Sequence, residues 1–307
     1  MSILATAADP LYAQPRAERP AYATGMLLDA QDFSDEQTYH RGRLALAMAF
    51  LAGGGTLAGL KVDHVPQSPT QAEEIRVQPG VAVDRLGRLI EVPRPACRGL
   101  ADWFADVAAA DGGDTLRTSA YDKLSRFLSA RMRDSGPALP ARAVVADVFL
   151  RFAQCTVGLT PGFAAGPFDA LNAVSTSRIR DAYELLMVPR AGLSDVQLGL
   201  PLPPADPALG NPASSPAQRR DAAQDAVLGT FAASGFGSGS GNGGSAGLPP
   251  APEDPPNLDT SAVFIARVLL PVGAADPPVR TADAPLVDNF ARRFLPSVPL
   301  LAQWAGL

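Results

Sequence analysis

The chain has 307 residues, enough for one large domain or two small ones. Hydrophobic residues make up 47% and charged residues 19%, so the sequence predicts a substantial core. A net charge of −5 and a pI near 5.1 argue against a nucleic-acid-binding surface.

The first 24 residues predict an extended arm. Pro10, Pro15 and Pro20 recur every five residues, a spacing that favours extended chain lying on a surface. We expect no secretion signal, because the segment lacks a basic start followed by an apolar run. No run in the chain approaches the ~20 apolar residues that span a bilayer, so we expect no membrane span.

Residues 34–51 predict the longest helix. Ser34 is the predicted N-cap, and Gln37 completes a capping box. The first half is polar, whereas 44–51 is apolar on nearly every face, which predicts burial in the core or against another subunit. The glycines at 53–55 predict the end of the helix. A phosphate-binding role for them is disfavoured, since no Lys-Ser/Thr follows.

Residues 56–92 predict β structure. Thr56–Val65 fits one strand, and 75–92 fits a hairpin with roughly alternating apolar residues. Asp84–Gly87 is its predicted turn, with Gly87 at positive φ. Asp84 and Arg88 flank this turn and can be read as a catalytic pair, but an aspartate bonded to its own turn backbone is the interpretation that we favour.

Two helices follow in the prediction, one at 100–110 and one from Asp114 to about Arg133, with Gly112-Gly113 between them. The second has a stripe of apolar residues, and its basic residues lie mostly off that stripe. We interpret the basic residues as a solvated face, with nucleic-acid binding as the weaker alternative.

Three further strands complete the predicted core: 141–157, 182–188 and 263–272. Arg178, Arg180, Asp181 and Glu184 lie before or within the second of these strands. We expect these four charged residues to pair with one another or with a neighbouring subunit.

Residues 189–259 are rich in Pro, Gly and Ser and predict an insertion that is largely loop. A patch at 217–231 can form a helix, whereas 234–247 has the composition of a flexible linker. In the closing segment, 285–307, we expect a helical turn at 289–294. Its apolar residues are expected to dock on the core or on a partner: Leu300, Leu301, Trp304 and Leu307.

The predicted fold class is α+β: a β-rich core of mixed or antiparallel sheet or sandwich, a long N-terminal helix, a helical hairpin-like segment and the insertion. The predicted organisation is an arm at 1–24, a core at 25–188, the insertion at 189–259, and a C-terminal strand and docking tail at 260–307.

The sequence offers little for metal or cofactor chemistry. Its only cysteines are Cys97 and Cys155, and its only histidines are His40 and His64. These four residues match no zinc-finger spacing, so we expect no metal site and no cofactor. Buried free thiols in a protein made in a reducing cytosol are the interpretation we favour.

Two stretches resemble a known family. GMLLDAQDFSDEQTYHRGRLALAMAFLAGGGTLAGLKV (25–62) resembles a recurrent opening, G-x-L-L-x-x-x-D-F-x-x-E-Q-x-Y, then a Leu-rich helix and G-x-G-x-x-x-G-L-x-V. VQPGVAVDRLGR (77–88) resembles V-x-P-G-x-A-x-D-x-x-G-R. Weaker matches include FLRFAQCTV, SRIRDAYEL and VFIARVLLPV. The family comprises structural proteins of phage-tail-like contractile injection systems and contractile tails. Two departures, Gly54 and Ala58, imply different local packing.

The resemblance implies a structural subunit of such a particle, at the baseplate or its peripheral fibre and cage elements, and no enzyme. Its implied partners are copies of itself and baseplate, sheath or tube components, without nucleic acid. The protein would be made in the cytoplasm and assembled into a phage-tail-like particle or virion. The candidate protein–protein interface residues are Leu44, Met48, Phe50, Leu51, Arg178, Arg180, Leu300, Leu301 and Trp304.

Two alternatives stay open at this point. A tail-fibre module that binds a surface glycan or receptor would use exposed aromatic platforms, for which the candidates are Trp103, Trp304, Tyr22 and Tyr121. A carboxylate-based hydrolase would need two acids in opposed environments, for which the candidates are Asp84, Asp147 and Glu184.

Overall fold

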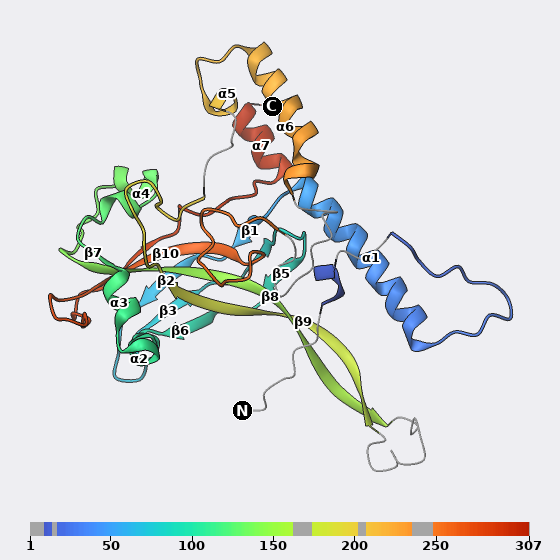
Figure 1. Ribbon diagram of the computed structural model, residues 1–307, viewed down its shortest axis with the longest axis horizontal. Helices are drawn as coiled ribbons and strands as arrows, with labels where there is room; N and C mark the ends of the chain where they lie inside the picture. The colour runs from blue at the N-terminus through green and yellow to red at the C-terminus, as the bar shows by residue number, and fades with distance from the viewer. Residues whose placement is uncertain (1–8, 14–16, 162–173, 202–206, 235–247, 307) are drawn as a thin grey trace.

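The computed structural model describes residues 9–13, 17–161, 174–201, 207–234 and 248–306. Antiparallel sheets form its centre, and helices lie around or project from them (Figure 1). The predicted α+β fold with a β-rich core and a long N-terminal helix is therefore confirmed.

The largest sheet is built on the long strand β8 (Ala143–Pro161). One edge of β8 pairs with β10 (Val263–Pro271), which in turn pairs with β11 (Leu286–Asp288). The other edge pairs with β9 (Val174–Pro189) and β7 (Ala120–Tyr121). All of β10 and the first half of β8 are buried, so these two strands form the middle of the fold.

Two small antiparallel sheets complete the β structure. One has the order β1 (Gly55–Gly59), β4 (Gly80–Val83), β5 (Leu89–Val92), and the other β2 (Val62–Val65), β3 (Glu74–Val77), β6 (Ala96–Gly99). The single strand predicted at 56–65 is wrong, because it is split between the two sheets. Gly59 and Leu60 both take positive φ, 63° and 56°, and this turn breaks the strand.

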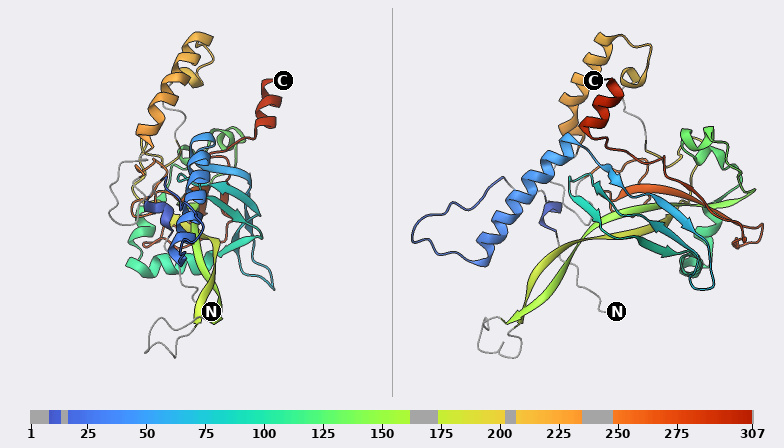
Figure 2. Two further views of the ribbon diagram at one scale, coloured as in Figure 1. Left: turned by 90° about the vertical axis from the view of Figure 1, so that its right-hand side faces the viewer. Right: turned by 180° about the vertical axis from the view of Figure 1, so that it is seen from behind.

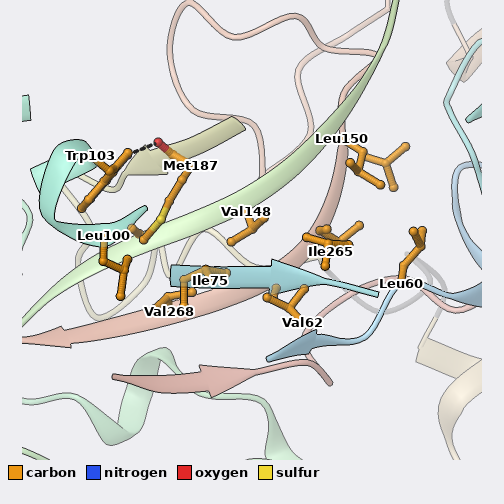
Figure 3. Packing of buried hydrophobic residues seen from close by; sticks show 14 of the residues in the cluster. Leu60, Val62, Ile75, Leu100, Trp103, Val148, Leu150, Met187, Ile265 and Val268 are labelled. Carbon is orange, nitrogen blue, oxygen red and sulfur yellow. Dashed lines mark hydrogen bonds between the residues drawn. The ribbon is translucent and has the colours of Figure 1, made fainter. Parts of the chain in front are cut away.

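The main core joins all three sheets and the helix α2 (Leu100–Asp111) (Figure 3). Trp103 is buried there, and its Nε1 donates to the Met187 carbonyl oxygen at 2.7 Å. The predicted helix at 100–110 is confirmed, and it ends at Gly112 with φ 66°.

The second helix predicted from Asp114 to Arg133 is wrong. The chain instead forms α3 (Asp114–Thr118), β7, the short 3-10 helix η2 (Ser125–Phe127) and α4 (Ala130–Asp134). The helix has to end because β7 pairs with the start of β8, and tertiary pairing outweighs local propensity. The apolar residues of the predicted stripe are nevertheless largely buried: Leu116, Leu124, Phe127 and Leu128.

The N-terminal helix α1 spans Ala30–Leu51 and starts earlier than predicted. Its N-cap is Asp29, whose Oδ1 accepts from the backbone N–H groups of Gln31 and Asp32. The predicted cap Ser34 lies inside the helix and donates its hydroxyl to the Ala30 carbonyl oxygen. The predicted end is confirmed, since Gly53 takes φ 74° directly after the C-cap.

The predicted extended arm is wrong at residues 10–13. These form the 3-10 helix η1 (Pro10–Ala13), and Leu11 is buried. Asp9 anchors the segment to the same chain, because its carboxylate accepts from Arg41 of α1 at 3.1 Å and from Arg88 at 2.9 Å. Residues 1–8 and 14–16 lie outside the described residues.

The C-terminal third adds α5 (Pro207–Gly210), α6 (Pro216–Ala233) and α7 (Val298–Ala305). The helix predicted at 217–231 is thus confirmed, while most of the predicted linker at 234–247 lies outside the described residues. The helical turn predicted at 289–294 is wrong. Asn289 instead exchanges two hydrogen bonds of 2.8 Å with the Val62 backbone, which ties this segment to the core, and the chain bends at 290–292.

Candidate assembly surface

Helix α1 contacts the core along a narrow strip. Ala45 is buried, and the turn between β4 and β5 packs against the α1 backbone there. Arg41 on the same side binds Asp9. The remaining surface of the helix faces away from the β core, which is consistent with its projection in Figure 1.

The side of α1 that faces away from the core carries most of the residues that the sequence analysis names as interface candidates on this helix. Leu44 and Leu51 are exposed, Leu51 at 86%, and Phe50 is exposed at 37%. Met48 is only half-buried. The second half of α1 is therefore not enclosed by the described part of its own chain.

Helix α6 extends this apolar side. Figures 1 and 2 show α6 continuing beyond the C-terminal end of α1, away from the sheets. Phe231 of α6 stacks on Phe50 of α1, with ring centroids 5.7 Å apart and an interplanar angle of 17°. We call the following six exposed side chains of the two helices the α1–α6 surface: Leu44, Phe50, Leu51, Val227, Leu228 and Phe231.

The α6 residues of this surface are absent from the sequence-based candidates. The signal was present, because Val227, Leu228 and Phe231 follow the i, i+1, i+4 spacing of one helix side. The sequence predicts a helix at 217–231, but nothing in it indicates that this helix meets α1.

The C-terminal candidates lie elsewhere. Leu300, Leu301 and Trp304 are exposed on α7, Trp304 at 86%, so they do not dock on the described part of the core. The left view of Figure 2 separates α7 from α6, and the structure does not bring the two sets together. Leu307 lies outside the described residues.

Arg178 and Arg180 lie on a third projection, the outer part of the β8–β9 hairpin (Figure 1). Both are exposed, and neither forms an ion pair with another residue in the described ranges. Glu184 instead binds Arg151 across the hairpin, and Asp181 accepts from Gln154 at 3.1 Å. Mutual pairing of the four charged residues is therefore wrong, because cross-strand neighbours on β8 are closer.

The buried charges form networks that hold the fold together. Asp84 Oδ1 accepts from the backbone N–H groups of Leu86 and Arg88, each at 2.9 Å, which is the turn role that we favoured. Its Oδ2 accepts from Arg88 Nε at 2.7 Å. Arg88 also donates to Asp9 and Ser261, so one guanidinium links the turn, the N-terminal segment and the start of β10.

A second network surrounds Arg267, which is fully buried in β10. Its Nε and Nη2 donate to Asp147 of β8 at 2.7 and 2.9 Å. Further bonds reach the carbonyl oxygens of Phe127, Leu198 and Gly199. Arg190 lies 3.2 Å from the same carboxylate. The group is satisfied on every side and stabilises the sheet.

The candidate acids for hydrolysis therefore serve as ion-pair partners. Asp84 and Asp147 are buried against arginines, and Glu184 pairs with Arg151 on the hairpin. The structure also has a wide cleft of about 1760 Å³. Four of the charged groups along its wall form two ion pairs, Arg85 with Asp254 and Arg293 with Glu253.

Other candidate chemistry is dispersed. Cys97 is exposed and Cys155 partly exposed, so the prediction of buried thiols is wrong; both lie on strands whose outer face meets solvent. No group of three or more potential metal-ligating side chains occurs within the described ranges. Among the proposed aromatic platforms Trp103 is buried, and the Tyr121 hydroxyl donates to the Arg190 carbonyl oxygen.

Comparison with known proteins adds no assignment. No protein-family profile matches the chain, and no curated protein matches it significantly. None of the helices in the described part of the chain has the length and apolar character that a bilayer crossing requires.

Proposed function

We propose that this chain is a structural subunit of a contractile, phage-tail-like particle, at the baseplate or its peripheral fibre elements. It acts through protein–protein contacts with its own copies and with other particle subunits. The resemblance of residues 25–62 and 77–88 supports the class of particle. The exposed apolar side of α1 and α6 supports the mode of action.

The observation that carries the proposal is that the hydrophobic core is closed without any contribution from the exposed apolar side of α1 and α6. The main core is built from the strands and α2, and its leucines and valines are almost fully buried. Leu51 and Leu228, in contrast, are 86% and 80% exposed. Apolar surface gains about 25 cal/mol per Å² when it leaves water. A partner that covers these residues therefore gains binding free energy without remodelling the core.

The test is incorporation into particles. A tagged full-length chain is expressed in the organism that encodes it, and particles are isolated by sedimentation. We expect the tag to sediment with sheath and tube proteins, and the genes beside its own to encode such components. A stable monomer that enters no particle would contradict the proposal.

A pair of variants links incorporation to the surface. Leu51→Asp places a charge in the α1–α6 surface, and we expect at least a tenfold loss of tag from the particle fraction. Val196→Asp is the matched control, since Val196 is 91% exposed in a loop outside that surface. Equal incorporation of both variants would show that other contacts hold the subunit.

A further inference from the structure

We infer that residues 9–13 are an exchangeable docking segment. It binds within its own chain when copies of the chain are far apart, and on a neighbouring copy when copies are held together. The inference rests on the proposed function, because a particle is what holds copies side by side. It depends on the fit of the docking segment and on the length and exposure of the connector that follows it.

Asp9 makes the charged contact of the docking segment. Its carboxylate lies between α1 and the β core, where it accepts from Arg41 Nη2 at 3.1 Å and from Arg88 Nη1 at 2.9 Å. The side chains of Asp9 and Arg88 are 3% and 1% exposed, so salt screens this pair little. The docking segment therefore supplies a negative charge that balances a buried arginine.

Tyr12 binds the same arginine through its ring and its hydroxyl. The Arg88 guanidinium carbon lies over the ring, 4.3 Å from its centroid. The hydroxyl donates to Asp259 Oδ2 at 2.5 Å and accepts from Arg88 Nη2 at 3.2 Å. The ring also packs with Leu86 and Leu248. We call the residues that bind Asp9 and Tyr12 the Arg88 site: Arg41, Leu86, Arg88, Leu248 and Asp259.

These contacts identify the sequence that fits the Arg88 site. They come from the stretch Asp-Pro-Leu-Tyr (9–12), in which Leu11 is also buried at 6% exposure. An empty site would take Asp9 away from the buried Arg88, and removing one partner of a buried ion pair is strongly destabilising. A second copy of the chain carries the same four residues, so it can fill the site with contacts that the structure already shows.

The connector from the docking segment to α1 is longer than binding within one chain requires. Sixteen residue steps separate Ala13 from the N-cap Asp29, and extended chain can span about 53 Å over them. Arg41, which binds Asp9, lies twelve residues beyond Asp29, or about 18 Å along α1. The connector is therefore long enough to reach an Arg88 site on a neighbouring copy.

The connector also makes few contacts that exchange would break. In its described part, residues 17–29, every residue except Pro20 is exposed. Its hydrogen bond with α1, from the Tyr22 hydroxyl to Glu36, is solvent-exposed. Figure 1 shows this part as a wide loop that extends away from α1 and from the sheets. A different path of the connector therefore leaves the core and α1 unchanged.

Exchange between copies is close to neutral in free energy. The docking segment makes the same contacts in either chain, so the difference arises from the local concentrations of the two sites. A flexible connector gives an effective concentration on the order of millimolar. An isolated chain in dilute solution therefore keeps the segment on its own site. Adjacent copies in a particle offer their sites at a comparable local concentration, and each exchanged segment then links two subunits.

The first experiment shortens the connector in the full chain. Deleting residues 17–28 keeps Asp29 and leaves four residue steps from Ala13, which span about 14 Å at most. That is less than the ~18 Å from Asp29 to Arg41, so docking within one chain is strained. By sedimentation velocity at 100 µM, we expect a dimer fraction at least fivefold above that of the parent chain.

A matched variant shows whether the docking segment forms this dimer. The shortened chain with Asp9→Ala and Tyr12→Ala lacks the contacts with the Arg88 site, so its dimer fraction should return to that of the parent. Asp106→Ala in the shortened chain, an exposed change on α2, should leave the dimer fraction unchanged. Circular dichroism checks that each variant is folded.

The second experiment uses photo-crosslinking and keeps the connector at full length. Ala13, which is exposed beside Tyr12, is replaced by p-benzoylphenylalanine. In the isolated chain at 1 µM, the crosslinked product should keep the monomer mass. In isolated particles we expect dimers and larger products, whose crosslinked peptides join residue 13 to residues 248–261 of another copy. The same group at Val279, exposed between β10 and β11, is the control and should not label 248–261.

The outcomes separate this inference from the proposed function. A dimer of the shortened chain that requires Asp9 and Tyr12, with crosslinks between copies in particles, supports exchange. A shortened chain no more dimeric than its parent overturns it, as do particles in which residue 13 crosslinks only within one chain. Either result leaves the proposed function standing if the chain enters particles. A chain that enters no particle but forms the Asp9-dependent dimer retains exchange and loses that function.

Discussion

Gly87 lies against Ala45, where the turn between β4 and β5 meets α1. A β-carbon built on Gly87 would be 1.7 Å from the Ala45 carbonyl oxygen, and Gly87 itself has a φ of 84°. Both facts require glycine here. This contact fixes which side of α1 faces the core, and therefore which side it presents outward.

Gly87→Ala should consequently destabilise the protein by at least about 3 kcal/mol, through backbone strain and the clash together. Gly112→Ala is the matched control, because Gly112 has a φ of 66° with nothing within 4 Å of the added carbon. It should cost only about 1 kcal/mol. Urea unfolding measures both, and equal losses would mean that the Ala45 contact contributes nothing.

Asp9 provides a second attachment of the N-terminal segment, and its side chain is 3% exposed. Asp9→Ala leaves Arg88 Nη1 and Arg41 without this acceptor, so the free energy of unfolding should fall by about 1–3 kcal/mol. Asp106→Ala removes an exposed pair with Arg98 and should change it by less than ~1 kcal/mol. Limited proteolysis between residues 17 and 29 should accelerate for Asp9→Ala alone. An unchanged cleavage rate would show that Leu11 and Tyr12 hold the segment unaided.

Arg267 should be the charge to which stability is most sensitive. Arg267→Met leaves Asp147 buried with only Arg190 beside it and frees three backbone carbonyl oxygens. Removing one partner of a buried ion pair costs about 3–5 kcal/mol. Arg151→Met breaks the half-exposed pair with Glu184 and should cost less than ~1 kcal/mol. Similar losses in denaturant unfolding would contradict a special role for the buried network.

The sequence predicts the fold where local patterns and tertiary contacts agree. Strands that are apolar at almost every position, such as β10 with Arg267 as its one charge, are recognisable because burial on both faces leaves no alternation to misread. The N-cap of α1 is harder to predict from the sequence, because Asp29 and Ser34 both suit the role. Only the path of the chain decides between them. The break between β1 and β2 has one local signal, Gly59, which suits a positive φ, whereas positive φ at Leu60 is unusual for leucine.

The residues of the candidate assembly surface likewise divide into those that local sequence patterns predict and those that only tertiary contacts reveal. The exposure of Leu44 and Leu51 follows from a helix that is apolar on more sides than one core can cover. The contact of Phe50 with Phe231 joins residues far apart in the sequence, so no local pattern predicts it. The sequence predicts the helix at 217–231 itself, but not the element that its apolar residues contact, because spacing along one helix carries no information about its partner.

The titration of Asp254 makes the stability of the folded protein depend on pH, and the direction of that dependence follows from its pKa. Its side chain is 3% exposed, and its Oδ1 has no hydrogen-bond partner within the described structure. Burial raises the pKa of Asp254 to about 6 from 3.8, although the Ala251 N–H and the Arg85 guanidinium favour the ionised form. Between these values the folded state holds a proton that the unfolded state has lost, so stability falls as the pH rises from about 4 to 6.

Asp254→Asn removes this titration and keeps an oxygen acceptor for Ala251. Relative to the variant, the wild-type free energy of unfolding should decrease by about 3 kcal/mol between pH 4 and pH 7 and stay constant above that range. Asp102→Asn, at an exposed position of α2, supplies the control profile. The measurement is urea unfolding at half-unit pH steps. A wild type that gains stability over the same interval would show that Arg85 stabilises the carboxylate by more than burial disfavours it.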